Sequence, residues 1–590
     1  MSGFLRGLAV SRAEALCILA TVLAMVALGL LMEGDGYNLR ILTLAVLFAG
    51  AATAWNLVGG FANLISMGHA AFFGLGAYAS TLLFIHYGLS PWGGMLVAGF
   101  IGVLASLVIG IPTMHLRGHY YTLATLAAVE LLRILALYFT GLTGGPVGLS
   151  VPYLPNASFW AFQFEGSRPY YFIALGMLAV VLAVSYGFDR GPLGYRLRAL
   201  KNSPEAAEAS GVDTTRAKLI ANAWSGGLMA AFGTLYAQFQ FFIDPDTVFG
   251  FWTISIKLAM MTILGGIGLI WGPFVGALIL VPLDEWANAT FTGNSAALSR
   301  FIYGALLIAL ILIRPNGLLS IVKGLLPAAR PQVAPATAVL TTADAAPGDP
   351  LLVVEGLTRQ FGGLIAVNEV SFTLNGAEIL GLIGPNGAGK STTFTLLAGL
   401  DQPTRGSVTL EGTRLSGLPA HAVARLGVVK TFQNTALFED MSILDNVVVA
   451  GLLRCPTLAQ ARALGLEALE LVGLDPDLAP TAGELNTVDR LRLEIARAVT
   501  TRPKVLLLDE AMAGLTPQET DLALEMIRRL RASGMAIIVV EHNMRAVMAV
   551  ADRIVAMDHG VKIAEGRPQE VARHPKVIES YLGGEHRDVA

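Results

Sequence analysis

The first half of the chain alternates long apolar segments with short polar ones. About ten segments are apolar enough to be membrane-spanning helices, and they lie at residues 15–32, 39–58, 63–86, 92–111, 120–139, 170–187, 219–242, 253–270, 273–286 and 301–313. A helix needs about 20 mainly apolar residues to cross a bilayer. The third and ninth segments are the weakest crossings, and either could be re-entrant or half-length. The pattern predicts an all-α membrane domain of about ten transmembrane helices over residues 1–320.

The polar interruption at residues 189–218 indicates which side of the membrane this domain faces. It carries six basic residues, Arg190, Arg196, Arg198, Lys201, Arg216 and Lys218. Short loops rich in Lys and Arg stay in the cytosol. An even number of spans precedes the loop and another even number follows it, so the second half of the chain is also expected in the cytosol.

Beyond the last apolar segment the pattern changes twice. Residues 321–349 are rich in Ala, Pro and Thr, which cannot build a core, and we expect an extended linker there. From residue 350 to residue 590, buried-strand patterns alternate with helical ones. That alternation predicts an α/β nucleotide-binding domain.

A phosphate-binding pattern opens this second half. Residues 384–391 read GPNGAGKS, which fits G-x-x-x-x-G-K-[ST], and they follow an apolar run at 378–383. Glycines let backbone N–H groups turn inward around phosphates, the lysine reaches the β and γ phosphates, and the serine joins a Mg²⁺ shell. We therefore expect ATP and Mg²⁺ as cofactors. The residues expected at the nucleotide are Gly384, Pro385, Asn386, Gly387, Ala388, Gly389, Lys390, Ser391 and Thr392.

A second motif follows about 120 residues later. The apolar run 504–508 ends in Asp509 and Glu510. Asp509 is placed to hold Mg²⁺ through water, and Glu510 to act as general base on the attacking water. Many strands end in acidic residues, so this motif is informative mainly because it follows a phosphate loop.

Composition agrees with a protein that lies partly in lipid. The hydrophobic fraction is 54%, only 14% of residues are charged, and the net charge of −3 argues against a nucleic-acid partner. Cys17 and Cys455 are the two cysteines and cannot form a disulfide framework, which fits an ATP-binding half in a reducing cytosol.

Several runs in the membrane half resemble the permease subunits of branched-chain amino acid ABC importers. They are WNLVGGF at 55–61, SMGHAAFFGLGAY at 66–78, LRGHYY at 116–121, GGIG at 265–268 and GP at 272–273. In that family a cytosolic loop carries a short coupling helix that docks on the ATPase, and NSPEAAEASG at 202–211 matches it. Ser203 is suited to cap this helix, Pro204 to its first position and Gly211 to its end. A solvated helix without a partner is the alternative.

The nucleotide-binding half resembles ABC transporter ATPases, and the phrases FQN at 432–434, RLEIARA at 492–498, AEG at 564–566 and YLG at 581–583 resemble the branched-chain amino acid subunit. The resemblance implies further roles. Phe361 would stack on adenine, Gln433 would contact Mg²⁺ and water, and His542 would bond the γ phosphate. A surface aromatic and a core histidine are the alternatives for Phe361 and His542.

One segment departs from the family. Where these ATPases carry Leu-Ser-x-Gly-Gln, residues 485–489 read LNTVD, and we call this the signature segment. Asn486 still offers a donor, and a helix starting near Asp489 still offers its positive end. Val488 is bulky where glycine allows close approach, and Asp489 adds a negative charge near phosphate.

These observations predict ATP-driven import of branched-chain or related amino acids by a fused permease and ATPase. Glu510, His542 and Gln433 are the expected catalytic residues, and Ser391, Gln433 and Asp509 the expected metal ligands. The expected partners are a second permease and a different ATPase in a heterodimer, a periplasmic or extracellular substrate-binding protein, and the lipid of a bacterial cytoplasmic membrane. Import of urea, amides or aromatic acids, an exporter half-transporter, and a non-transporting sensor are the alternatives.

Overall fold

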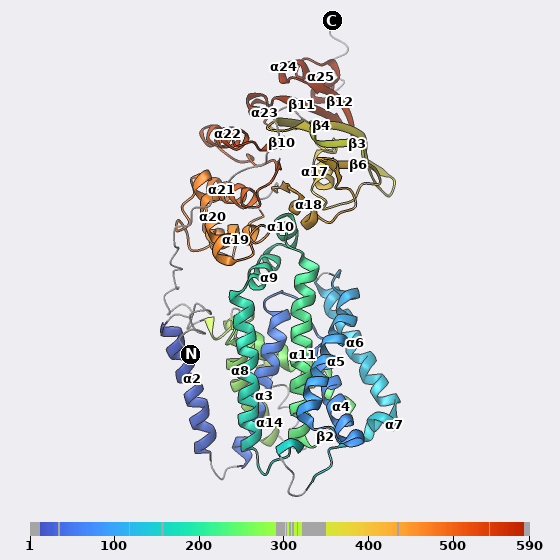
Figure 1. The fold of residues 1–590 in the computed structure, drawn as a ribbon, viewed down its shortest axis with the longest axis vertical. Coiled ribbons are helices and arrows are strands. Elements are labelled where there is room, and N and C mark those ends of the chain that lie inside the picture. Colours follow the sequence, from blue (N-terminus) through green and yellow to red (C-terminus); the bar gives the residue numbers. More distant parts are fainter. Residues whose placement is uncertain are drawn as a thin grey trace. The chain divides into compact units, whose positions relative to one another are not determined.

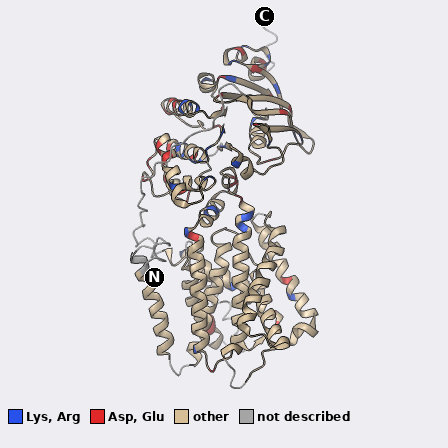
Figure 2. Cartoon of the chain, in the orientation of Figure 1, with Lys and Arg blue, Asp and Glu red and all other residues tan. Residues whose placement is uncertain are grey.

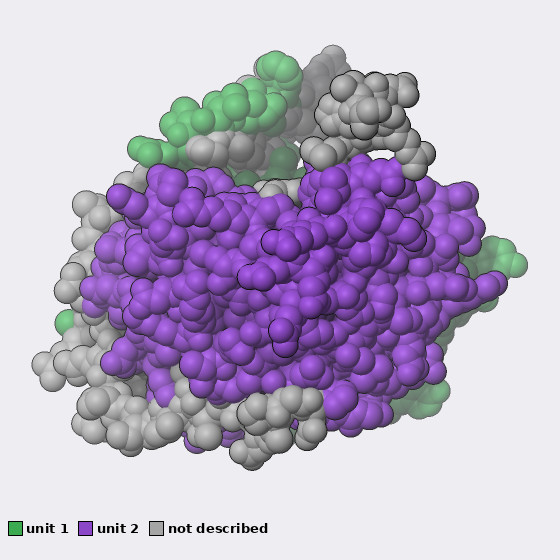
Figure 3. Space-filling model, turned by 90° about the horizontal axis from the view of Figure 1, so that it is seen from above, with its two compact units in different colours: residues 1–197, 215–332 green, residues 198–214, 333–590 purple. Residues whose placement is uncertain are grey.

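The computed structural model describes residues 12–32, 36–116, 118–154, 159–290, 350–432, 436–541 and 543–582, with isolated residues between 301 and 320. Contacts divide the chain into two compact units (Figures 1 and 3). Unit 1 holds residues 1–197 and 215–332, and unit 2 holds residues 198–214 and 333–590. The short loop segment 198–214 therefore belongs to unit 2. The expected linker at 321–349 lies outside the described residues.

Unit 1 is a bundle of long helices. They are α2 (Arg12–Leu31), α3 (Gly36–Gly59), α4 (His69–Tyr87), α5 (Pro91–Thr113), α6 (His119–Tyr138), α8 (Arg168–Arg190), α11 (Thr214–Gln240), the π-helix η3 (Phe251–Ile256) with α13 (Lys257–Gly265), and α14 (Gly272–Thr290). Short elements join them: α7 (Thr140–Thr143), η1 (Gly145–Val147), β1 (Leu149–Ser150), η2 (Phe159–Ala161), β2 (Phe242–Ile243) and α12 (Pro245–Val248). Helix α9 (Pro192–Asn202) crosses the division between the units. Charged residues are sparse along these helices (Figure 2).

Six helices in the described part are long and apolar enough to cross a membrane: α3, α4, α5, α6, α8 and the continuous run at Pro245–Gly265. This is fewer than the ten segments predicted. Helices α2, α11 and α14 match three further predicted segments in position, but their described residues do not satisfy the requirements of length and of apolar character together. The last predicted span, residues 301–313, falls largely outside the described residues. The multi-helix class of the domain is confirmed, whereas the number of crossings stays a prediction.

Two of the predicted segments are broken where glycines cluster. The third begins at His69 rather than at residue 63, because residues 60–67 are not helical. The eighth ends at Gly265 rather than at residue 270. The second break contacts helix α3, since Asn56 Nδ2 of α3 donates to the Leu269 carbonyl at 3.0 Å and Gly268 N donates to Asn56 Oδ1 at 2.9 Å. Side-chain amides thus replace lost helix hydrogen bonds, as a buried backbone requires.

His69 is buried, at the start of α4. Its Nε2 lies 2.8 Å from Ser225 Oγ and its Nδ1 lies 3.0 Å from Ser66 Oγ. Both ring nitrogens therefore have partners, and the histidine joins the break before α4 to α11.

Charged residues in unit 1 form ion pairs. Glu130 and Arg133 share one face of α6, as their spacing predicts, with Arg133 Nη2 2.5 Å from Glu130 Oε1 and Nη1 2.5 Å from Asp246 Oδ1. Lys257 lies 2.8 Å from Asp284 Oδ2 on α14. Pairing is the expected state of charges in membrane helices.

Unit 2 has two sheets. The six-stranded sheet has the order β12-β11-β5-β10-β9-β8, and all its pairings are parallel except the antiparallel one between β11 and β12. The four-stranded antiparallel sheet has the order β4-β3-β6-β7. The strands are β3 (Pro350–Phe361), β4 (Leu364–Asn375), β5 (Ile379–Ile383), β6 (Arg405–Leu410), β7 (Thr413–Arg414), β8 (Val428–Lys430), β9 (Val505–Asp509), β10 (Ala536–Val540), β11 (Arg553–Asp558) and β12 (Val561–Gly566). Strands β5, β9 and β10 are buried along their whole length, which explains their unbroken apolar sequence.

The helices of unit 2 are α10 (Pro204–Ala209), α17 (Lys390–Leu397), α18 (Ala420–Leu426), α19 (Ile443–Gly451), α20 (Leu458–Val472), η5 (Ala482–Glu484), α21 (Thr487–Thr500), α22 (Pro517–Ala532), α23 (Met544–Val550), α24 (Pro568–Val571) and α25 (Pro575–Leu582). Some of these helices pack on the sheets, whereas α19, α20 and α21 pack mainly on one another. The predicted alternation of strands and helices is confirmed.

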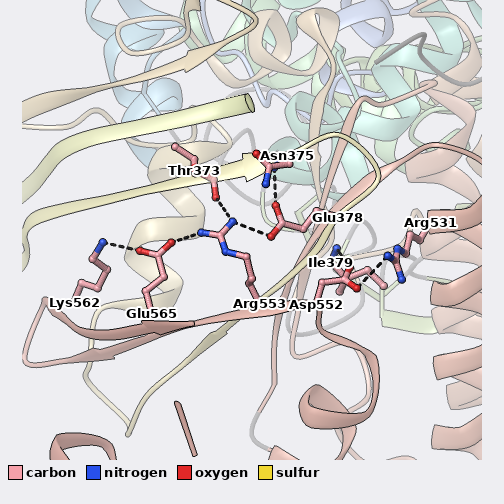
Figure 4. A network of polar contacts seen from close by, with 9 residues as sticks. All are labelled: Thr373, Asn375, Glu378, Ile379, Arg531, Asp552, Arg553, Lys562 and Glu565. Carbon is pink, nitrogen blue, oxygen red and sulfur yellow. Dashed lines mark hydrogen bonds and ion pairs between the residues drawn. The ribbon is translucent and has the colours of Figure 1, made fainter. Parts of the chain in front are cut away.

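A polar network ties the two sheets together (Figure 4). Arg553 on β11 lies 2.8 Å from Glu378 Oε1, donates to the Thr373 carbonyl on β4, and also contacts Glu565 on β12. Glu378 Oε2 accepts a hydrogen bond from Asn375 N at 2.7 Å. This network fixes the turn that leads into β5, and β5 carries the phosphate loop.

Candidate functional site

The phosphate loop, residues 384–391, joins the buried strand β5 to helix α17. Three of its glycines have backbone angles in the left-handed region, with φ of 157° at Gly384, 83° at Gly387 and 93° at Gly389. A Cβ on Gly389 would lie 2.4 Å from the Ala366 carbonyl oxygen, and one on Gly384 would lie 2.3 Å from that of Met557. Both the conformation and the space require glycine. The strand, loop and helix that the motif predicts are therefore present.

Lys390 sits at the start of α17 and is 5% exposed. Its Nζ donates to the carbonyls of Gly384 at 2.7 Å and Pro385 at 2.9 Å. Burial lowers the pKa of Lys390, and the nearby carboxylates of Glu510 and Asp509 oppose that shift. The loop thus folds around its own lysine. Ser391 follows it in the first turn of α17 and is exposed.

Asp509 is the last residue of strand β9 and Glu510 follows it, both close to Lys390 of this loop. Asp509 N donates to Thr431 Oγ1 at 3.3 Å, and Glu510 N donates to the Val540 carbonyl at 2.8 Å. Glu510 has φ of +49°, a left-handed conformation that is uncommon for a residue with a side chain. Such an outlier beside a phosphate loop marks a place where backbone strain aims a side chain.

The carboxylate of Asp509 is buried, with only 3% of the side chain exposed. Its Oδ2 lies 2.9 Å from Lys430 Nζ, whereas its Oδ1 has no hydrogen-bond partner in the described part of the chain. A buried oxygen without a partner is costly unless something binds it. Magnesium in nucleotide sites uses one or two carboxylates, a hydroxyl and phosphate oxygens. Asp509 and Ser391 fit that group.

The structure says less about three other expected site residues, Gln433, His542 and Phe361. Gln433 and His542 lie outside the described residues, so their roles stay predictions. Phe361 is the last residue of β3 and is 46% exposed, with the Arg359 guanidinium 4.5 Å from its ring centre. An exposed, cation-supported ring agrees with stacking on a base, but it also agrees with a surface aromatic.

The signature segment is a helix start. Helix α21 begins at Thr487, two residues earlier than expected, and Asn486 is its N-cap, accepting a hydrogen bond from Asp489 N at 2.9 Å. Asn486 Nδ2 donates to Asp489 Oδ2 at 2.8 Å, and Arg492 Nη1 lies 3.1 Å from Asp489 Oδ1. The donor that Asn486 offers and the negative charge that Asp489 adds are therefore engaged with each other, and Arg492 also pairs with Asp489. Val488 faces a cavity of about 210 Å³ that Leu515 also lines.

The predicted coupling helix is present as α10. Ser203 caps it by accepting from Ala206 N at 3.2 Å, Pro204 is its first residue, and Gly211 follows it with φ of +87°. Every local expectation for this helix is confirmed. A Cβ at Gly211 would lie 2.7 Å from the Leu453 side chain.

Residues around α10 contact the nucleotide-binding part of unit 2. Asp440 N donates to Asn202 Oδ1 at 3.2 Å, and His421 Nε2 on α18 lies 3.7 Å from Asp213 Oδ2. The alternative of a solvated helix without a partner is therefore wrong.

Sequence reasoning missed three buried groups near the site. Lys430 pairs with Asp509 as described. Glu494, one turn past the signature segment, accepts from Phe432 N at 2.8 Å. Glu541 accepts from Met512 N at 2.8 Å, and burial raises its pKa to about 7. The available signal was a lysine or glutamate at the end of an apolar strand, or on the apolar face of a helix.

Fold and site together define an ABC-type ATPase unit joined to a helical membrane unit. Three family models match the chain: the branched-chain amino acid transport system permease component at residues 37–311, ABC transporter at 367–513, and branched-chain amino acid ATP-binding cassette transporter at 561–587.

Curated relatives agree with these family models. The high-affinity branched-chain amino acid transport ATP-binding protein LivG of Salmonella typhimurium is 44% identical over 250 residues, which is 40% of this chain and 98% of that protein. BraF of Pseudomonas aeruginosa, with the same description, is 41% identical over the same shares. The lipopolysaccharide export system ATP-binding protein LptB of Escherichia coli is 34% identical over 237 residues, with 40% of this chain and 98% of that protein covered.

This chain therefore belongs to the branched-chain amino acid ABC transporter family, with permease and ATP-binding parts in one polypeptide. It is a membrane-embedded protein whose cytoplasmic unit hydrolyses ATP to drive transport.

Proposed function

We propose that the chain imports branched-chain amino acids, with the phosphate loop, Asp509 and Glu510 binding and hydrolysing ATP together with Mg²⁺. The observation that carries this proposal is that permease and ATPase matches to the same transport family occur on one chain. ATP phosphates lie against the backbone N–H groups of the loop, where Lys390 contributes positive charge.

The residues then have distinct roles. Mg²⁺, when bound, would supply positive charge against the charge that develops on the phosphates. Asp509 and Ser391 would hold the metal, directly or through water. Glu510 would accept the proton of the attacking water. Gln433 and His542 would contact the metal and the γ phosphate, as in the family, and Phe361 would stack on adenine.

Coupling to the membrane unit would run through α10. Its contacts to Asp440 and His421 join the loop segment 198–214 to the ATPase, so a shift of the ATPase moves the ends of α9 and α11. Paired replacement of Asn202 and Asp213 by Ala should lower transport at least fivefold and leave basal ATPase activity near wild type. Lys replacements at Glu205 and Glu208 should act in the same direction, and Asp477→Ala on a remote exposed loop is the control. A proportional loss of both activities would assign this segment a folding role only.

The complete transporter would include a second permease, a different ATPase and a substrate-binding protein outside a bacterial cytoplasmic membrane. Each closed nucleotide site would pair one chain's phosphate loop with the other chain's signature segment. The Asn486, Val488 and Asp489 substitutions make the two sites unequal if the partner keeps the usual signature. Purification of the full chain from its membrane, with identification of what copurifies, tests this assembly. A functional homodimer would show that the partner proposal is wrong.

Uptake by proteoliposomes that contain the copurified complex tests the substrate. Radiolabelled leucine should accumulate in the presence of ATP, and excess isoleucine or valine should compete. Competition by urea, acetamide or phenylalanine instead would indicate that the transported substrate belongs to the class of the competing compound. Transport away from the binding-protein side would indicate an exporter, and ATP hydrolysis without any flux would indicate a sensor.

A further inference from the structure

We propose that Lys430 neutralises the charge of Asp509 and thereby weakens the binding of Mg²⁺ at the nucleotide site. This inference rests on the proposed role of Asp509 as a metal-holding residue.

Lys430 is built into the site by the sheet. It ends strand β8, where it pairs in register with Leu507 of β9, two residues before Asp509. Its side chain is 8% exposed, and its Nζ lies 2.9 Å from Asp509 Oδ2 and 5.5 Å from the centre of the Phe432 ring. A long, flexible side chain is thus held in one place at the end of a buried strand.

Lys430 is the cation that contacts Asp509 in the described part of the chain. The other nearby lysine, Lys390, donates to the carbonyls of Gly384 and Pro385. Asp509 Oδ1 has no hydrogen-bond partner there. One carboxylate oxygen therefore faces a resident ammonium group, and the other is left for a second cation.

A resident positive charge next to a metal-binding carboxylate lowers the metal affinity, because the lysine repels the metal and shares the carboxylate charge. Removal of a positioning partner usually weakens a metal site, since the ligand then swings away. Asp509 has a second support, because Thr431 Oγ1 accepts its backbone N–H and the side chain is 3% exposed. Loss of the Lys430 charge should therefore leave the carboxylate in place with an uncompensated charge, and so strengthen metal binding.

The experiment uses the full-length chain with Glu510→Gln, so that ATP is not consumed. Free Mn²⁺ is measured by electron paramagnetic resonance during titration in the presence of ATP. Lys430→Met should bind Mn²⁺ about tenfold more tightly than the Glu510→Gln parent, because a positive charge close to the metal has been removed. Lys430→Arg should match the parent, because it keeps the charge. Lys504→Met is the matched control, since it removes a lysine ion pair, to Glu411, from the same sheet beyond the site.

Thermal unfolding gives a second readout. With ATP and a chelator, Lys430→Met should unfold at a lower temperature than the parent, because a buried carboxylate has lost its partner. Addition of Mg²⁺ should raise that temperature by more than it does in the parent. If Lys430→Met does not fold, Lys430→Gln keeps one donor to Asp509 without the charge and tests the same expectation.

Unchanged or weaker Mn²⁺ binding by the folded, uncharged variant would overturn the role of Lys430. Failure of the metal proposal itself looks different: Asp509→Asn in the parent would then leave Mn²⁺ binding unchanged, and both ideas would be rejected. Tighter binding in Lys430→Met, abolished by adding Asp509→Asn, would support both.

Discussion

The phosphate loop and the signature segment are both phosphate-contacting elements of this family, yet they respond differently to sequence change. The loop keeps its pattern and needs glycine at Gly384 and Gly389 because of backbone angle and space. The signature segment has lost its serine and glycine, and it still begins a helix, because Asn486 caps α21. A site made of strained backbone tolerates little change, whereas a helix start accepts any competent cap.

Charge is also handled differently in the two regions. Around the phosphate loop, Lys390 and Lys430 face Asp509 and Glu510. In the signature segment, Asp489 is matched locally by Arg492 and by the Asn486 amide. The charge of the acidic substitution is therefore balanced within its own segment.

The largest effect is expected from Glu510→Gln. This variant tests the catalytic role of the region around the phosphate loop. General-base catalysis contributes about 10²–10⁴-fold. ATPase turnover should fall by that range, while ATP affinity stays within about twofold and a closed state accumulates. Phosphate release and fluorescent-nucleotide binding measure the two quantities. Full turnover in the variant would remove Glu510 from the role of base.

Lys390→Ala should abolish nucleotide binding in practice. A charged hydrogen bond is worth about 1.5–3 kcal/mol, and two phosphates are contacted, so ATP affinity should fall at least a hundredfold. Lys504→Ala is the control lysine, paired with Glu411 at the far end of β9. ATP binding that survives in Lys390→Ala would show that the loop is not the phosphate site.

Two alanine substitutions separate conformation from space within the loop. Gly387→Ala meets no atom within 4 Å, whereas Gly389→Ala approaches the Ala366 carbonyl at 2.4 Å, and both positions have positive φ. Each should cost about 1 kcal/mol for conformation. Gly389→Ala should cost at least 2 kcal/mol more because the backbone must move. Thermal unfolding and ATP affinity check the order, and equal losses would contradict the packing argument.

Glu541 gives a pH-dependent contrast next to Glu510. Its pKa is raised from 4.5 to about 7 by burial, so the folded chain holds a proton that the unfolded chain releases. Stability then falls as pH rises from about 4.5 to 7 and remains lower above that. Glu541→Gln keeps the acceptor for Met512 N and cannot ionise. The difference in unfolding temperature between Glu541→Gln and wild type should be larger at pH 8 than at pH 5. Each kcal/mol of stability that the wild type loses over this pH range should add about 2–4 °C to that difference.

The smallest effect is expected on the signature side. Restoring Ser at position 486, Gly at 488 and Gln at 489 should raise ATPase activity by less than about threefold, because Asp489 is already paired and α21 is already capped. The single variant Asp489→Ala, which leaves Arg492 without this partner, should be measured beside the restored signature. A gain of tenfold or more on restoration would show that the altered segment is defective and that only an intact partner sustains hydrolysis.

Much of the protein followed from local sequence alone. The phosphate loop, the capped coupling helix, the buried strands before Asp509 and the helical membrane half all depend on residues close in sequence, where glycine angles, caps and apolar periodicity act directly. The broken segments before His69 and after Gly265 were placed only approximately, because polar contacts from distant helices decide where a glycine-rich stretch stops being helical.

Tertiary structure alone decided which charges meet. Lys430 and Asp509 are 79 residues apart in the numbering of the chain, and only the pairing of β8 with β9 brings their side chains to 2.9 Å. The contacts of Asn202 and Asp213 with Asp440 and His421 likewise join residues about 200 positions apart. Long-range electrostatics depends on burial and distance in space, and neither quantity is encoded in spacing along the chain.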